Sequence, residues 1–291
     1  MDMTVQPIDR FVRANNLRFH YLDCGSADKP PLILLHGMGQ TCHTWDFFSA
    51  AMSPQFHVLA FDQRGHGDTD WAPDRNYSRS AMVSDVAAFT QALGLERFFL
   101  AGMSMGGMNS LCFAADYPQS VEALVVVDIG PRIEKEGVRH IRDFMSNHTE
   151  FSDLDEAAAV IHRFNPRRPL EAIRKFTCVY NLKQLPSGKW TWKYDTYFRD
   201  GHRPPDAQMH DQLAAAARRI KCPTLLVKGA ESDVFSLEGA RELQQLVPDS
   251  QFALVAKAGH SVMGDNPAGF EAAVRDFYRA KGYLTARETG V

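Results

Sequence analysis

The sequence predicts an α/β fold, namely a doubly wound, mostly parallel sheet of eight strands with helices on both faces. Two observations predict it. Short, continuous apolar runs recur between Gly, Pro or polar residues, which is typical of strands buried on both faces. Segments with the apolar spacing of helices separate these runs, and a repeated strand–helix order favours a parallel sheet. The length of 291 residues is sufficient for a large core.

An antiparallel hairpin is expected first, with strands at 9–14 and 17–23 joined by Asn15-Asn16. Six apolar runs follow it as the expected core strands: residues 31–36, 56–62, 97–103, 121–129, 223–229 and 251–257. Helical spacing predicts four helices between and after them: residues 79–93, 104–117, 237–246 and 267–281.

The strand–helix alternation stops at Pro131. Residues 132–218 have a mostly helical pattern, broken by prolines, and contain no clear core strand. We therefore expect a helical cap, inserted after the sixth strand and lying over the edge of the sheet. The core is then formed by residues 1–131 and 219–291.

Large aromatic residues alternate with polar ones near the end of the cap. This alternation can place Trp190, Trp192 and Tyr194 on one face, and we interpret them as substrate-binding residues. The alternative is that they hold the cap to the core. Arg132 and His140 are possible contacts for a substrate carboxylate, although a solvated arginine at the hinge of the cap explains Arg132 better.

Composition excludes several classes of partner. The net charge is −3, without a run of like charges, which argues against nucleic acid and anionic membranes. We expect a cytoplasmic protein, because no signal peptide and no apolar stretch of about 20 residues occurs. Five scattered cysteines predict reduced thiols and no structural zinc. We expect neither a metal nor a cofactor, a small-molecule acyl substrate, and a monomer or homodimer.

The most informative segment is Gly102-Met103-Ser104-Met105-Gly106, between an expected strand and an expected helix. This Gly-x-Ser-x-Gly pattern at a strand-to-helix junction holds a serine in a tight, strained turn, with its hydroxyl above the sheet. The glycines are needed because a Cβ there would collide with neighbouring backbone. Ser104 is the predicted nucleophile.

A serine hydroxyl needs a general base, and His260 is the predicted one. It follows the last expected strand, so it lies on the same edge of the sheet as Ser104, where open α/β sheets place their chemistry. His36 and His66 also lie on this edge, but each precedes the nucleophile in the chain, and we interpret them as loop-structuring residues. His43 is a further residue that can reach the pocket.

The base in turn needs a carboxylate that fixes its tautomer. Asp233 is the predicted acid, because it follows the strand immediately before the one that leads to His260. Asp128, at the end of the strand after the nucleophile helix, is a rival with a suitable position. Glu231 is a weaker one.

With these residues in place, the chain resembles the α/β-hydrolase fold family over residues 10–281. The resemblance depends on five ordered features: Leu35-His36-Gly37-Met38-Gly39, Phe61 to Gly67, Gly102 to Gly107, Asp233, and Gly259-His260. It implies that the backbone N–H groups of Met38 and Met105 form an oxyanion hole.

The resemblance also implies the reaction class. A serine nucleophile is unlike haloalkane dehalogenases and epoxide hydrolases, which carry aspartate there. The expected activity is carboxylesterase-like: hydrolysis of carboxylic esters through an acyl-enzyme intermediate. Amide, lactone or carbon–carbon bond hydrolysis and a hydrolase-fold ligand sensor are the alternatives. The loop after His36 lacks the Gly-Pro-Gly frequent in carbon–carbon hydrolases, whereas Asp128 to Arg132 resembles esterases and an amidohydrolase of vitamin B6 breakdown.

Overall fold

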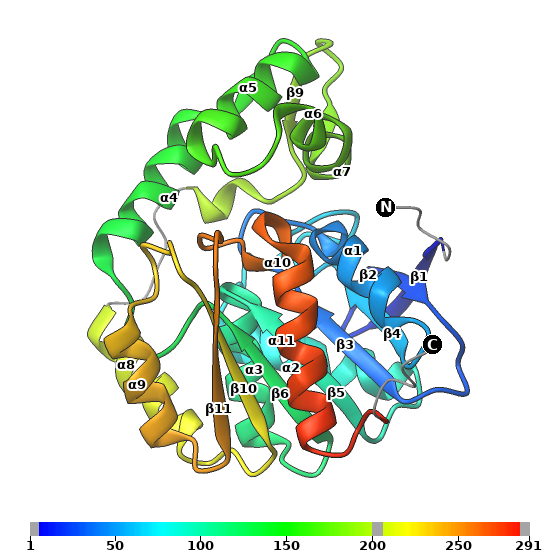
Figure 1. The fold of residues 1–291 in the computed structure, drawn as a ribbon. Coiled ribbons are helices and arrows are strands. Elements are labelled where there is room, and N and C mark those ends of the chain that lie inside the picture. The colour runs from blue at the N-terminus through cyan, green and yellow to red at the C-terminus, as the bar shows by residue number, and fades with distance from the viewer. Residues whose placement is uncertain (1–5, 200–205, 286–291) are drawn as a thin grey trace, which may run out of the picture.

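The centre of the molecule is an eight-stranded sheet in the order β1-β2-β4-β3-β5-β6-β10-β11 (Figure 1). The structure is a computed structural model that describes residues 6–199 and 206–285. The strands are β1 (Ile8–Ala14), β2 (Leu17–Cys24), β3 (Pro31–Leu35), β4 (His57–Phe61), β5 (Phe98–Met103), β6 (Val121–Val127), β10 (Thr224–Gly229) and β11 (Ser250–Val255). Strand β2 pairs antiparallel with β1 and β4, and the others pair in parallel. The predicted fold class is confirmed.

Strand register brings the carboxyl ends of the central strands together. Leu35 at the end of β3 pairs with Phe61 of β4 and Gly102 of β5, and Met103 pairs with Val127 of β6. Because parallel strands end at one edge of a sheet, the loops that follow them gather there. Residues far apart in the sequence therefore meet at this carboxyl edge.

Helices cover both faces of the sheet. One face carries α2 (Arg79–Ala92), α3 (Met105–Asp116), α8 (Asp206–Ala217) and α9 (Leu237–Leu246), and the other carries α1 (Asp46–Met52) and α11 (Pro267–Ala280) (Figure 1). The alternation of side chains along a strand divides the core accordingly. Ile33 and Leu35 pack in the first layer, whereas Leu32 and Leu34 pack in the second. In the described part of the chain, no helix is both long and apolar enough to cross a bilayer.

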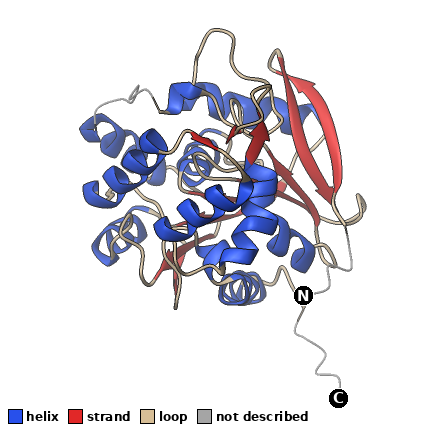
Figure 2. Cartoon of the chain, turned by 90° about the horizontal axis from the view of Figure 1, so that it is seen from above, coloured by secondary structure: helices blue, strands red, loops and turns tan. Residues whose placement is uncertain are grey.

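An insertion between β6 and β10 lies over the carboxyl edge of the sheet (Figures 1 and 2). It contains α4 (Lys135–Asn147), β7 (Glu150–Phe151), α5 (Leu154–Phe164), α6 (Leu170–Ala172), the π-helix η2 (Ile173–Cys178), α7 (Val179–Asn181), β8 (Leu182–Gln184), β9 (Trp190–Trp192) and the 3-10 helix η3 (Thr196–Phe198). We call residues 132–199 the cap.

The cap differs from the expected one in two respects. Its short strands β7, β9 and β8 form an antiparallel sheet, which the helical pattern did not predict. Helix α8 falls within the expected limit of residue 218, but it packs against α3 and α9 of the core. Its residue Ala217 belongs to the same core cluster as Leu111 of α3, so burial against the sheet layer separates this helix from the cap.

Candidate active site

Ser104 occupies the junction between β5 and α3, where the chain turns sharply. Its backbone has φ +52° and ψ −114°, a conformation that residues with a Cβ rarely adopt. A Cβ on Gly102 would lie 2.3 Å from the carbonyl oxygen of Gly106, and one on Gly106 would lie 2.3 Å from that of Leu35. The spacing of the two glycines is therefore required by close backbone contacts, as predicted.

His260 lies in the loop between β11 and α10 (Val262–Asp265), and it lines the same cavity as Ser104. Its Nδ1 is 2.8 Å from Oδ2 of Asp128, whose side chain is fully buried. With Nδ1–H donated to this carboxylate, Nε2 of the imidazole keeps its lone pair and is free to accept a proton. The structure thus brings Ser104, His260 and a buried carboxylate to one edge of the sheet.

The carboxylate at His260 is Asp128, and the prediction of Asp233 in this position is wrong. Asp128 follows the last residue of β6 directly and stays at the strand end, whereas Asp233 comes after a turn of three residues that leads away from β10. The Asp233 side chain is 59% exposed, and its nearest ionic partner is His140 at 3.6 Å. The rival Glu231 is exposed and pairs with Arg167.

Further contacts hold Asp128 in place. Its Oδ1 accepts the backbone N–H of Gly229 at 2.9 Å, and its Oδ2 also accepts the hydroxyl of Ser232. Lys228 is 4% exposed, and its Nζ donates to the carbonyl of Gly229 at 2.7 Å. Burial lowers the pKa of Lys228, although the nearby charge of Asp128 opposes this shift. The end of β10 and the turn after it therefore supply donors to the acid rather than the acid itself.

The loop that contains Met38 is held by hydrogen bonds on both sides. The N–H of Gly37 donates to Oε1 of Gln40 at 3.0 Å, and the N–H of Gly39 donates to Nε2 of His66 at 3.1 Å. Met105 is the first residue of α3, where backbone N–H groups have no partner within the helix. Met38 and Met105, whose N–H groups are predicted to form an oxyanion hole, both line the cavity that Ser104 lines.

Gln63 and Asn109 connect this loop to the nucleophile helix, and the sequence analysis missed both. Gln63 donates its backbone N–H to Nε2 of His36 at 3.0 Å and its side-chain amide to the carbonyl of His36 at 2.6 Å. Oε1 of Gln63 accepts from Nδ2 of Asn109 at 2.7 Å. The contacts of His36 and His66 are those of loop-structuring residues, as the sequence analysis expected.

The protein should lose stability steeply below pH 6.5, because His36 and His66 are buried in the neutral form. Burial lowers the pKa of His66 to about 3 and also lowers the pKa of His36. An unfolded histidine binds a proton near pH 6.5, so the unfolded state gains protons first as the pH falls. His66 should therefore remove about 1.4 kcal/mol of unfolding free energy per pH unit between pH 6.5 and about pH 3, and His36 should add a loss in the same direction.

Urea denaturation between pH 7 and pH 4 measures this loss. His66→Gln retains an acceptor for Gly39 but does not titrate, so its stability should fall less steeply by about 1.4 kcal/mol per pH unit. An unchanged slope in this variant would contradict the burial of a neutral imidazole at position 66. His20 does not affect the test. Burial lowers its pKa, but the hydrogen bonds to Asp62 and Asp9 and the charges of Asp62 and Asp68 together raise it above the usual value, so its contribution to stability changes only above pH 6.5.

The cavity beside Ser104 has a volume of about 1420 Å³, larger than the range of roughly 300–1,000 Å³ usual for small-molecule sites. Ser104, Met108, Cys112 and Asp116 all line it. These residues recur every four positions and share one face of α3, so the cavity extends from the nucleophile along this helix. Helices α2 and α8 and the cap form the other walls.

The three cap aromatics have different positions. Trp192 and Tyr194 line the cavity, whereas Trp190 does not. The ring of Trp192 stacks on that of Tyr194, with 5.9 Å between the ring centroids. Its Nε1 donates to the carbonyl of His148 at 2.6 Å. Trp190 packs against the cap's own hydrophobic cluster, which is a role within the cap rather than the predicted substrate contact or the alternative of holding the cap to the core.

Asp265 joins the cap to the loop that carries His260. Its Oδ2 accepts the backbone N–H of Gly259 at 3.0 Å, next to His260. Its Oδ1 accepts Nδ2 of Asn165 at 2.8 Å and lies 3.4 Å from Nε of Arg168, both in the cap. The cap and the His260 loop therefore share one buried carboxylate, which the sequence pattern did not indicate.

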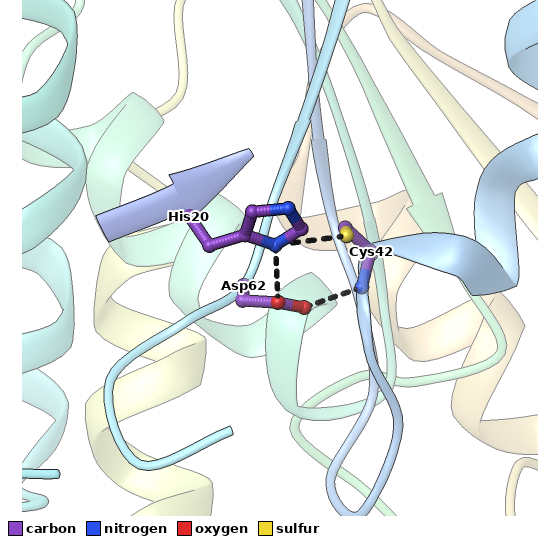
Figure 3. A group of neighbouring side chains, drawn as sticks. All are labelled: His20, Cys42 and Asp62. Carbon is purple, nitrogen blue, oxygen red and sulfur yellow. Dashed lines mark hydrogen bonds and ion pairs between the residues drawn. The ribbon is translucent and has the colours of Figure 1, made fainter. Parts of the chain in front are cut away.

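Figure 3 shows a second cluster of titratable side chains, none of which lines the cavity. His20, Cys42 and Asp62 offer ligand atoms within 4.8 Å of one another. Asp62 accepts from Nδ1 of His20 at 2.8 Å, from the N–H of Cys42 at 2.7 Å and from the N–H of Asp68 at 3.0 Å. Burial raises the pKa of Cys42 well above its usual value, which disfavours a thiolate ligand. These hydrogen bonds indicate a structural role for the cluster, in which Asp62 holds the loop after β4 in place.

Comparison with known proteins agrees with this fold. The chain matches the family model described as alpha/beta hydrolase fold over residues 30–180. It is 30% identical over 258 residues to an esterase of Mycobacterium tuberculosis, covering 86% of this chain and 83% of the relative. It is also 30% identical over 273 residues to N-formylmaleamate deformylase of Pseudomonas putida, covering 91% and 94%. The solved structure of E-2-(acetamidomethylene)succinate hydrolase superposes with a TM-score of 0.83 at 25% identity, covering 94% of this chain and all of that one (100%).

Proposed function

Because the chain belongs to the alpha/beta hydrolase fold family and is a hydrolase, we propose that it cleaves carboxylic acid derivatives through an acyl-enzyme on Ser104. The observation that carries this proposal is the pairing of His260 with buried Asp128 beside the cavity that Ser104 lines. Strain at Ser104 adds support, because unfavourable backbone conformations persist where function requires them.

In the proposed mechanism, Ser104 Oγ attacks the substrate carbonyl carbon while Nε2 of His260 takes the hydroxyl proton. Asp128 holds the imidazole by Nδ1 and stabilises the imidazolium that forms. The protonated His260 then gives its proton to the leaving group, which departs as the carbonyl re-forms. Water, deprotonated by His260, attacks the acyl-enzyme and releases the acid and free Ser104.

The negative oxygen of each tetrahedral intermediate requires donors that are in place before the reaction. We propose the backbone N–H groups of Met38 and Met105 for this role. The hydrogen bonds of Gly37 and Gly39 to Gln40 and His66 support it, because they hold the loop on either side of Met38. Removal of one such donor commonly costs 10² to 10³ in kcat, so rigidity here has a large effect.

We propose carboxylic esters as the substrate bond, with amides as a second candidate. The esterase relative favours the ester. The deformylase, and a 2-(acetamidomethylene)succinate hydrolase 26% identical over 274 residues, favour the amide, and both names describe acids as substrates. The same residues serve both bonds, since His260 protonates either leaving group.

Labelling with a fluorophosphonate tests the proposal. The reagent should modify one residue stoichiometrically, and peptide mass spectrometry should identify it as Ser104. Hydrolysis of matched p-nitrophenyl esters and p-nitroanilides then ranks the two bonds by kcat/KM. Modification of a different serine would refute the nucleophile, and labelled Ser104 without measurable turnover of any acyl substrate would favour a ligand-sensing role instead.

A further inference from the structure

The cavity is lined by more cationic than anionic side chains. Among the described residues, the lining contains five arginines and four carboxylates: Arg75, Arg79, Arg167, Arg168, Arg219, Asp116, Glu231, Asp233 and Asp265. A buried charge without a partner is costly, so each of these groups should have a counter-ion or a reason to lack one. Their pairing identifies the group that is left over.

Three of the four carboxylates pair with arginines, and the fourth, Asp233, is largely exposed to solvent. Arg219 pairs with Asp116, Arg167 with Glu231 at 2.8 Å, and Arg168 with Asp265 at 3.4 Å. Asp233 faces His140. Two arginines remain, and Arg75 is exposed to solvent, where its charge is screened.

Arg79 is the remaining arginine. No carboxylate of the described residues lies within ion-pair distance of it, and its hydrogen bonds go to neutral acceptors: Nη1 is 3.4 Å from Oδ1 of Asn109, and Nη2 is 3.4 Å from Sδ of Met108. Burial lowers the pKa of Arg79, but a guanidinium stays charged at neutral pH. Arg79 is also the first residue of α2, where the helix dipole is positive and disfavours a cation. This wall of the cavity therefore favours an anion.

We infer that Arg79 binds a carboxylate of the substrate. The guanidinium presents paired N–H groups that fit the two oxygens of a carboxylate. Met108 and Asn109, which contact Arg79, follow Ser104 by four and five residues along α3, a rise of about 6–7.5 Å. The inferred substrate is thus a small acid whose carboxylate lies at about that distance from the bond that Ser104 attacks. This inference rests on the proposed function of Ser104.

A matched pair of substrates tests it: 4-acetoxybenzoate and its methyl ester, which differ in the charge at the far end of the ring. Arg79→Gln should lower kcat/KM for 4-acetoxybenzoate by about 10- to 100-fold relative to methyl 4-acetoxybenzoate, because charge-assisted hydrogen bonds are lost. Arg79→Lys should recover part of this ratio. Arg219→Gln is the control, since Arg219 lines the cavity but is paired, and it should leave the ratio unchanged.

Binding is measured separately from turnover. Glutarate should slow fluorophosphonate labelling of Ser104 in the wild type, and Arg79→Gln should raise the concentration needed by about 10-fold or more. Thermal unfolding of Arg79→Gln should occur no earlier than in the wild type, because an unpaired desolvated charge is removed. If glutarate protects both proteins equally, the inference is wrong while the role of Ser104 stands. If Ser104 is not labelled at all, the proposed function fails first.

Discussion

Asp128→Asn should lower kcat by roughly 10³ to 10⁴, with much less change in KM. Nδ1 of His260 lies 2.8 Å from the carboxylate, and donation of Nδ1–H to it leaves the lone pair of Nε2 for the Ser104 proton in the proposed mechanism. An asparagine amide can donate to Nδ1 instead, which moves the ring proton to Nε2 and disables the base. The charge that stabilises the imidazolium is lost as well. Steady-state kinetics on a p-nitrophenyl ester measures the effect.

Asp233→Asn is the matched control for this variant, because both changes remove one carboxylate from the same edge of the sheet. The Asp233 side chain is 59% exposed and does not contact His260, so kcat should change by no more than about 2-fold. Circular dichroism should establish that both variants are folded, since Asp128 also accepts from Gly229 and Ser232. If kcat falls strongly in Asp233→Asn and only slightly in Asp128→Asn, the acid of the triad is Asp233 and not Asp128.

Ser104→Ala should abolish turnover, with a loss of about 10⁶ in kcat, because no other group forms the acyl-enzyme. Residual hydrolysis should come from the oxyanion donors and from binding alone. The variant should still fold, since Ser104 is only partly buried and alanine keeps the same Cβ. Single-turnover assays and fluorophosphonate labelling both measure the loss. Turnover within 10-fold of the wild type would exclude Ser104 as the nucleophile.

Ser104→Gly separates the strain at this position from the chemistry. Both variants lack the hydroxyl, but glycine adopts φ +52°, ψ −114° without the steric cost that a Cβ brings. Ser104→Gly should therefore be more stable than Ser104→Ala by about 1 kcal/mol or more in urea denaturation. Equal stabilities would mean that the turn stores no strain.

Local sequence patterns were sufficient for the fold. The apolar run 97–103 and the helical spacing of 104–117 correspond to β5 and α3 within one or two residues, because burial on both faces of a parallel sheet leaves little choice of residue. The same holds for Ser104, whose flanking Gly102 and Gly106 are dictated by contacts within a few residues of the turn and with the adjacent strand. The sequence placed helix α8 in the expected cap of residues 132–218, because the sequence of a helix does not indicate which neighbour it packs against. In the structure it packs against α3 of the core.

Only the tertiary structure decided which acid reaches His260 and which desolvated arginine of the cavity has no carboxylate partner. Asp128 and Asp233 both follow buried strands, so their sequence neighbourhoods are alike. The two aspartates differ in their tertiary contacts. The turn after β10 leaves Asp233 exposed, whereas Asp128 accepts the N–H of Gly229 at the end of β10. The unpaired state of Arg79 likewise depends on ion pairs formed elsewhere in the cavity. The physical reason is that side-chain contacts across elements depend on three-dimensional distance and burial, whereas sequence patterns record only local periodicity and turn geometry.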